Sequence, residues 1–161
     1  MDDFDFYRLY KTLHMLAVIL LGGGIIVESL IGPMLPRAQS VAALKTLARV
    51  GRSTELFCTL PSLLLIPGFG YATAARADID LATTWLLIAQ IVFWIAALIS
   101  VFFLSLAMLR LHRRVEALPD SAEIPADVRE MVDNPVPAIL GGLLAIAYVF
   151  LVYLMVAKPA W

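Results

Sequence analysis

The sequence has few of the residues that hold metals or form disulfides: it contains one cysteine, Cys58, and two histidines, His14 and His112. A lone cysteine excludes an intrachain disulfide and any Cys-x-x-Cys redox or metal motif. Charged residues are also scarce, at 16% of the 161 residues, whereas a soluble domain has about 25%. The net charge of −1 gives no electrostatic basis for binding nucleic acid.

The amino-terminal stretch MDDFDFYRLYK lacks the basic region of a secretory signal, and the apolar run after it lacks a small-residue cleavage site. Signal peptides carry both features. The sequence therefore predicts that the first apolar segment stays in the chain as a membrane helix.

Apolar residues, by contrast, are in excess and make up 61% of the chain. A helix needs about 20 of them to cross the hydrocarbon of a bilayer, and a helix in lipid satisfies its own backbone hydrogen bonds. Four runs meet that length, at about residues 9–35, 56–75, 85–109 and 137–157. We predict an all-α fold, a single membrane domain (residues 1–161) that forms an integral membrane four-helix bundle.

Positive charge is divided unequally along the chain. Eight of the 12 Lys and Arg residues follow the first and third spans: Arg37, Lys45, Arg49, Arg52, Arg110, Arg113, Arg114 and Arg129. Because cytoplasmic loops carry an excess of Lys and Arg, we expect these loops in the cytoplasm and both termini on the outer side. The expected location is the inner (cytoplasmic) membrane, multi-pass. The expected partners are the lipid bilayer and either further copies of the chain or a larger membrane complex.

Two stretches outside the spans have recognisable local patterns. Residues 40–54 carry apolar and basic side chains on separate arcs, which predicts a basic amphipathic helix. It lies either on the membrane surface or as an inward extension of the second span. Residues 110–136 form a predicted cytoplasmic loop, with a short helix starting at Pro125. Pro61 and Pro67 should disturb the second span, because each removes a helical hydrogen bond.

Glu28 is a carboxylate inside the first apolar run. Ionisable residues within membranes usually face the bundle interior and pair with one another. We therefore predict a structural ion pair between Glu28 and an arginine of the inner boundary, Arg37, Arg49 or Arg52. The alternative is functional: Glu28 accepts protons in a permeation path.

His14 lies near the outer end of the same run, about 21 Å from Glu28 along a helix, so the two side chains cannot form one site. Three roles remain open: a hydrogen bond to a neighbouring helix, a copper ligand, or an axial ligand of a haem held between helices. The sequence places no second strong nitrogen or thiolate ligand at that depth, so we predict no metal site. His14 is the candidate haem ligand.

The pattern K-x-L-H-x-x-A-x-x-x-x-G-G, which begins at Lys11, resembles the first helix of a group of bacterial membrane proteins. The group includes the copper-resistance D (CopD) family, the HemJ-type protoporphyrinogen oxidases and a sister family of predicted integral membrane proteins of unknown function, which fits best. The stretch MLPRA, from Met34, extends the likeness. In HemJ-type proteins this histidine is thought to bind haem b, with a lysine in the third helix as partner. The resemblance implies haem b on His14 and puts Gln90 near the place of the lysine.

Three classes of function follow. We rank first a non-enzymatic membrane or accessory protein, because no set of polar groups converges in the sequence, and this ranking favours no enzymatic activity. The second class is a b-type haem- or tetrapyrrole-binding redox protein that uses His14. The third is a small transporter or copper-handling protein, for which Glu28 is the main indication.

Overall fold

The computed structural model describes residues 5–159, which form helices joined by short loops. Within these residues, four helical rods are long and apolar enough to cross a membrane. The predicted all-α, four-span architecture is therefore confirmed. The helical segments in chain order are α1 (Phe6–Met34), α2 (Val41–Thr54), η1 (Glu55–Thr59), α3 (Leu60–Arg76), α4 (Thr84–Ile99), η2 (Ser100–Ser105), α5 (Leu106–Glu116), α6 (Ala126–Asp133) and α7 (Val136–Ala157).

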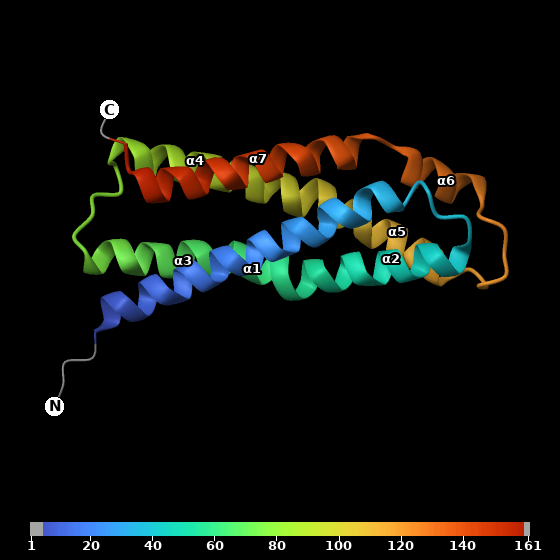
Figure 1. The fold of residues 1–161 in the computed structure, drawn as a ribbon, viewed down its shortest axis with the longest axis horizontal. Coiled ribbons are helices and arrows are strands. Elements are labelled where there is room, and N and C mark those ends of the chain that lie inside the picture. Colours follow the sequence, from blue (N-terminus) through green and yellow to red (C-terminus); the bar gives the residue numbers. More distant parts are fainter. Residues whose placement is uncertain (1–4, 160–161) are drawn as a thin grey trace.

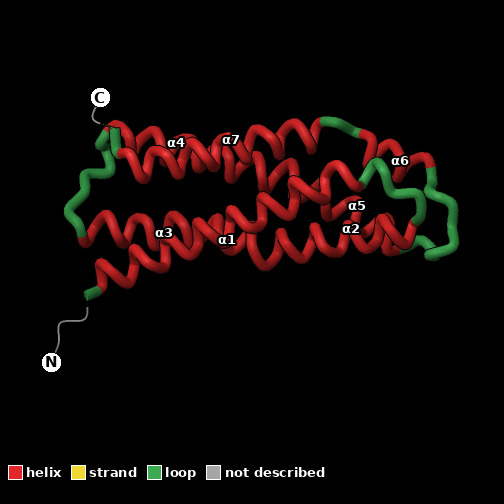
Figure 2. Tube along the Cα trace, viewed as in Figure 1, coloured by secondary structure: helices red, strands yellow, loops and turns green. Residues whose placement is uncertain are grey.

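The rods run side by side, and the loops lie at the two ends of the bundle (Figure 2). The first and last described residues lie at one end, called here the terminal end, while α2, α5 and α6 form the other, called the α6 end (Figure 1). Helix α1 packs against α3 and α7, α4 packs against α7, and α2 packs against α5. Each rod thus has neighbours that close a four-membered ring.

Residues 40–54 extend the second rod toward the α6 end. Ser40 caps α2 by accepting a hydrogen bond from the Ala43 N–H (3.2 Å), and α2 then continues through η1 into α3 without a break. The third rod likewise continues to Glu116, past the boundary at 109 that the apolar run indicated. Polar helical ends therefore project beyond the apolar spans at the α6 end.

Wide π-helical turns interrupt the second and third rods. In η1 the backbone N–H of Leu60 donates to the carbonyl of Glu55, one residue further back than in an α-helix. Pro61 follows immediately; it has no N–H, and its ring would clash with the Phe57 carbonyl in a regular helix. The π turn thus lies where the proline prevents α-helical bonding. No proline accompanies η2 (Ser100–Ser105).

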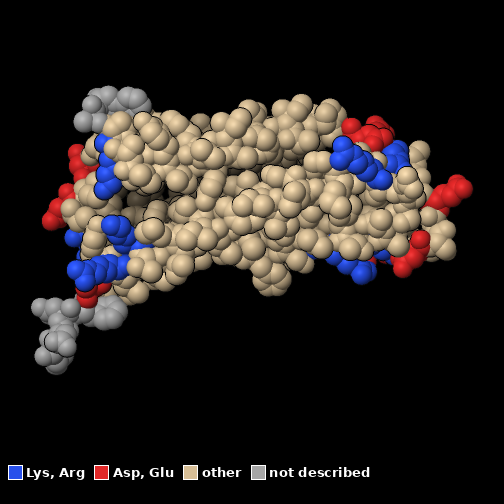
Figure 3. Space-filling view, viewed as in Figure 1, with Lys and Arg blue, Asp and Glu red and all other residues tan. Residues whose placement is uncertain are grey.

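The packed core lies at the α6 end. It consists of seven buried apolar residues: Ala38, Leu44, Ala48, Leu111, Val115, Val128 and Val132. In the apolar windows of the four spans, only 6% to 17% of the residues are buried within the described structure. Figure 3 shows charged side chains at the two ends of the visible face and an uncharged band between them. Lipid therefore covers the surface that the protein itself leaves bare.

Candidate functional site

A cavity of about 800 Å³ lies between the rods and extends from the α6 end past the middle of the bundle. Residues of all four rods line it, and most are apolar. Glycines, which have no side chains, contribute to its wall. Gly32, Gly141 and Gly142 lie in the wall, and a Cβ atom added to any of them would meet nothing within 4 Å. A side chain at any of these three positions would therefore meet open space and no neighbouring helix.

Glu28 lies in the wall of this cavity. Its Oε1 accepts a hydrogen bond from the Thr59 hydroxyl of η1 (3.0 Å). The two rods come close here because Gly24, one turn before Glu28, has no side chain. A Cβ atom at Gly24 would lie 3.1 Å from Thr59 Oγ1 and 3.2 Å from Cys58 Cβ. The local glycine therefore brings the hydroxyl to the carboxylate.

Glu55 is a second carboxylate in the same wall, and it is 3% exposed. Arg52, one turn earlier, donates from Nη1 to Glu55 Oε2 at 2.6 Å. The other oxygen, Oε1, is buried and has no hydrogen-bond partner among the residues that the structure describes. Thr59, which holds Glu28, lies one turn after Glu55. The π turn thus joins the two carboxylates into one polar cluster, defined here as Glu28, Arg52, Glu55 and Thr59.

The predicted ion pair of Glu28 is replaced by other pairings. Arg52 pairs with Glu55, and Arg49 pairs with Glu116 of α5 through two hydrogen bonds, at 2.6 and 2.8 Å. Arg37 lies in the turn after α1, where its backbone N–H donates to the Met34 carbonyl. Within residues 5–159, no ion pair joins Glu28 to an arginine. The reason is geometric: Arg49 and Arg52 have acidic partners at their own depth.

His14 lies against α3, outside the wall of the cavity. Its Nδ1 is 2.9 Å from the Ile66 carbonyl oxygen, and Gly70 leaves room for the ring, because a Cβ there would lie 3.1 Å from His14 Cε1. A carbonyl can only accept, so Nδ1 carries a proton, and in the neutral imidazole the lone pair is then on Nε2. The first alternative, a hydrogen bond to a neighbouring helix, is present, and a ligating nitrogen remains.

Gln90 serves the packing of α3 against α4. It accepts a hydrogen bond from the Tyr71 hydroxyl (3.2 Å) and donates to the carbonyls of Leu81 and Leu86 at 3.0 and 3.3 Å. Trp94 Nε1 donates to the same tyrosine oxygen at 3.4 Å. The side-chain oxygen and nitrogen of Gln90 are thus hydrogen-bonded to these partners and not to His14.

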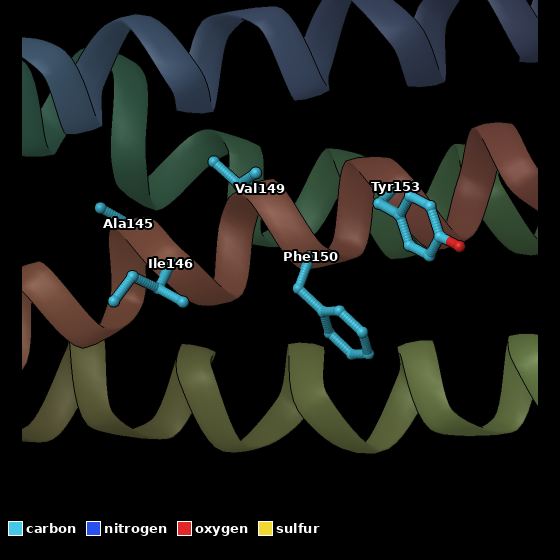
Figure 4. Close-up of a pocket in the computed structure, with 5 residues that line it drawn as sticks. All are labelled: Ala145, Ile146, Val149, Phe150 and Tyr153. Atoms are coloured by element: carbon cyan, nitrogen blue, oxygen red, sulfur yellow. The ribbon is translucent and has the colours of Figure 1, made fainter.

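A second hollow, of about 610 Å³, is lined by α7 alone. Figure 4 shows its five residues along one helix: Ala145, Ile146, Val149, Phe150 and Tyr153. Val149 is 66% exposed and Tyr153 56%, so the hollow belongs to the lipid-facing surface. No polar groups from different helices converge on it, and it does not form a site.

The family of the chain follows from one comparison. A model of the family described as "Predicted integral membrane protein (DUF2269)" matches residues 8–159. The chain belongs to this family. Searches of curated proteins and of solved structures found no match. The family has no assigned function, so what this DUF2269 protein does must be argued from its own residues.

In this DUF2269 protein, sequence reasoning found Glu28 but missed Glu55. The missed residue had a signal: Arg52 and Glu55 are three positions apart, a spacing at which side chains on one helix meet. That spacing predicts a contact between the two side chains only if α2 and the second span form one continuous helix. Among residues 5–159, no three His, Cys, Asp or Glu side chains lie close enough to hold a metal ion.

Proposed function

We propose that this protein is a small, non-enzymatic membrane transporter that moves a cation through the cavity, with Glu28 as the group that accepts it. One observation supports this above all: α1 and η1 place two carboxylates, Glu28 and Glu55, in the wall of one cavity. A permeation path needs several such groups, and the sequence alone offered only one. Of the three classes of function, transport is the one that uses them.

The two carboxylates have different partners, and this difference supports the role of Glu28. Glu55 has its arginine at 2.6 Å, whereas Glu28 has the neutral hydroxyl of Thr59. A charged carboxylate among apolar helices is costly without a cation beside it. Glu28 is therefore the position at which an arriving proton or cation relieves the largest cost.

The cavity has an entrance side. Its wall includes Arg110, Asp133 and Asn134 of the α6 end, and on α1 it reaches no further outward than Leu21. We propose that ligands enter from the α6 end and that this end faces the cytoplasm of the inner membrane, with both termini outside. The eight-to-four division of Lys and Arg supports this orientation.

The proposal extends to assembly. The apolar windows of the third and fourth rods are only 6% buried, which leaves faces for a second copy or for another membrane subunit. The mass of the detergent-extracted particle tests this. A mass above one chain supports a homo-oligomer or a complex, and a mass of one chain contradicts both.

Proton flux tests the transport function. The purified chain is reconstituted into lipid vesicles that contain a pH-sensitive dye, and a pH step is applied. We expect flux above that of empty vesicles, lost in Glu28→Gln and kept in Ser29→Ala, a neutral change in the same wall. Flux no higher than that of empty vesicles, or flux that Glu28→Gln leaves unchanged, contradicts the proposal.

A second function, binding of b-type haem, is favoured by the geometry of His14. Its Nδ1 is engaged with the Ile66 carbonyl (2.9 Å), which leaves Nε2 free, as in most metal-binding histidines. The resemblance to HemJ-type proteins points to the same residue. Because His14 does not line the cavity, a haem on Nε2 would not share the site of the carboxylates.

Visible absorption spectra of the oxidised and reduced protein test haem binding. A Soret band that disappears in His14→Ala supports it. A preparation that is colourless, and stays so after haem is added, contradicts it.

A further inference from the structure

We infer that the ligand of the cavity is a primary ammonium ion with an apolar body about the size of an aromatic ring. The inference rests on the proposed function, because it assigns a substrate class to the same cavity. It depends on three properties of the wall: its net charge, its unsatisfied acceptor and its apolar lining.

The charge of the polar cluster selects a monovalent cation. With both carboxylates ionised, Glu28 and Glu55 contribute two negative charges and Arg52 one positive charge, so the cluster carries −1. The wall also includes Arg110 and Asp133, whose opposite charges add nothing to the net charge. One monovalent cation therefore neutralises the cluster, whereas a divalent ion leaves an excess positive charge, and a neutral ligand leaves the negative charge uncompensated among apolar helices.

The unsatisfied acceptor selects a cation with N–H groups. Glu55 Oε2 is used by Arg52, while Oε1 is buried without a hydrogen-bond partner in the described part of the chain. A buried acceptor left unpaired is costly. A primary ammonium has three donors and can satisfy Glu55 Oε1 and Glu28 together. A quaternary ammonium has the same charge but leaves Oε1 unsatisfied.

The lining selects an apolar body. Beyond the polar cluster, the wall is built largely of Leu, Ile, Ala, Pro and Gly, with Phe93, Met108 and Tyr148 as its larger side chains. A volume of about 800 Å³ is much more than an inorganic ion needs. Moving apolar surface out of water is favourable. A hydrocarbon body attached to the ammonium therefore fits this space better than a bare ion does.

Isothermal titration calorimetry on the full chain in detergent tests the ligand class. The probe is 2-phenylethylammonium, and the comparators are 2-phenylethanol, which has no charge, and the trimethyl(2-phenylethyl)ammonium ion, which has no N–H. We expect the primary ammonium to bind about 10- to 100-fold more tightly than either comparator, the range that a charge-assisted hydrogen bond supplies. Equal binding of all three, or no binding of the amine, overturns the inference.

Two variants locate the binding in the cavity. Glu28→Gln removes the negative charge and should weaken binding of the amine at least about 10-fold. Gly141→Leu adds a large apolar side chain to a residue of the cavity wall; because a Cβ there meets nothing within 4 Å, the chain should fold normally, and we expect it to lose binding. Gly23→Leu is the matched control. Its Cβ also meets nothing within 4 Å, it lies outside the cavity wall, and binding should be unchanged.

Binding that Gly141→Leu leaves intact overturns the inference, whether or not Glu28→Gln folds. The proposed function fails separately. Tight amine binding in a protein that carries neither protons nor the amine into vesicles contradicts transport and keeps the ligand class. Proton flux that depends on Glu28 in a protein that does not bind the amine keeps transport and overturns the ligand class.

Discussion

At the α6 end, seven buried apolar residues pack together as in a water-soluble protein, whereas across the spans at most 17% of each apolar window is buried. The end is stabilised by removing side chains from water. The spans gain nothing comparable, because lipid tails are as apolar as the side chains they touch. There, close glycine contacts and a few polar bonds must hold the rods together.

Ion pairs also differ in burial between the tip of the α6 end and the place where this end meets the spans. Arg114 and Asp127 at the α6 end pair at 2.6 Å with side chains 42% and 52% exposed, whereas Arg52 and Glu55 pair at the same distance with side chains 21% and 5% exposed. Exposed pairs contribute little because water screens them. A buried pair contributes little while intact, yet its rupture leaves a buried charge.

The largest expected effect comes from breaking the buried pair. Arg52→Met leaves the Glu55 carboxylate unpaired and should lower the free energy of unfolding by about 3 to 5 kcal/mol. Unfolding in detergent, followed by circular dichroism, measures it. The double variant Arg52→Met/Glu55→Gln carries no unpaired charge and should regain most of the loss. A double variant as unstable as the single one contradicts the explanation.

The next effect concerns the core of the α6 end. Leu44 is fully buried at 0% exposure, so Leu44→Ala should cost about 2 to 5 kcal/mol in the same measurement. Leu64 is 76% exposed within the spans, and Leu64→Ala should change stability by no more than about 0.5 kcal/mol. Equal losses at the two positions would remove the distinction between the regions.

A smaller loss is expected at the contact between α1 and α7. The Tyr148 hydroxyl donates to the Val18 carbonyl at 3.0 Å, and a Cβ added at Gly22 would collide with that hydroxyl. Gly22→Ala should therefore cost about 1 to 3 kcal/mol. Gly23→Ala places its methyl group in open space and serves as the control. If both substitutions are neutral, close approach at Gly22 does not stabilise the bundle.

The smallest effect is expected for the exposed pair of Arg49 and Glu116. Their side chains are 62% and 31% exposed, so Arg49→Ala should barely move the unfolding midpoint. Any difference from the wild type should shrink further in high salt. A loss as large as that of Arg52→Met would show that exposure does not separate the two pairs.

The four spans could be predicted because hydrophobic run length depends only on the chain and the thickness of the bilayer. The pairings of the charged residues could not. Arg49 and Glu116 are 67 positions apart, and nothing in one sequence joins positions that distant. The hydrogen bond from Thr59 to Glu28 could not be predicted either, because a threonine in an apolar helix gives no periodic signal.

Only part of the candidate site could be predicted from the sequence. An isolated carboxylate such as Glu28 stands out in an apolar run, whereas Glu55 lies between the basic amphipathic segment and the second apolar run, where a charged residue is expected and gives no signal. The cavity itself depends on how four rods pack, and on glycines such as Gly141 whose sequence context does not reveal whether they face a neighbour or open space. Packing of this kind is a property of the folded chain.

Cys58 lies within η1, between Glu55 and Thr59, with its Cβ 3.2 Å from where a side chain on Gly24 would begin. It is also the sole thiol of the chain. A membrane-permeant alkylating reagent therefore has a single target, and that target lies at the seam where the first two rods touch. Because Cys58 is partly exposed, the rate of its modification reports how accessible this contact is to the reagent, in the native sequence and with no cysteine to remove beforehand.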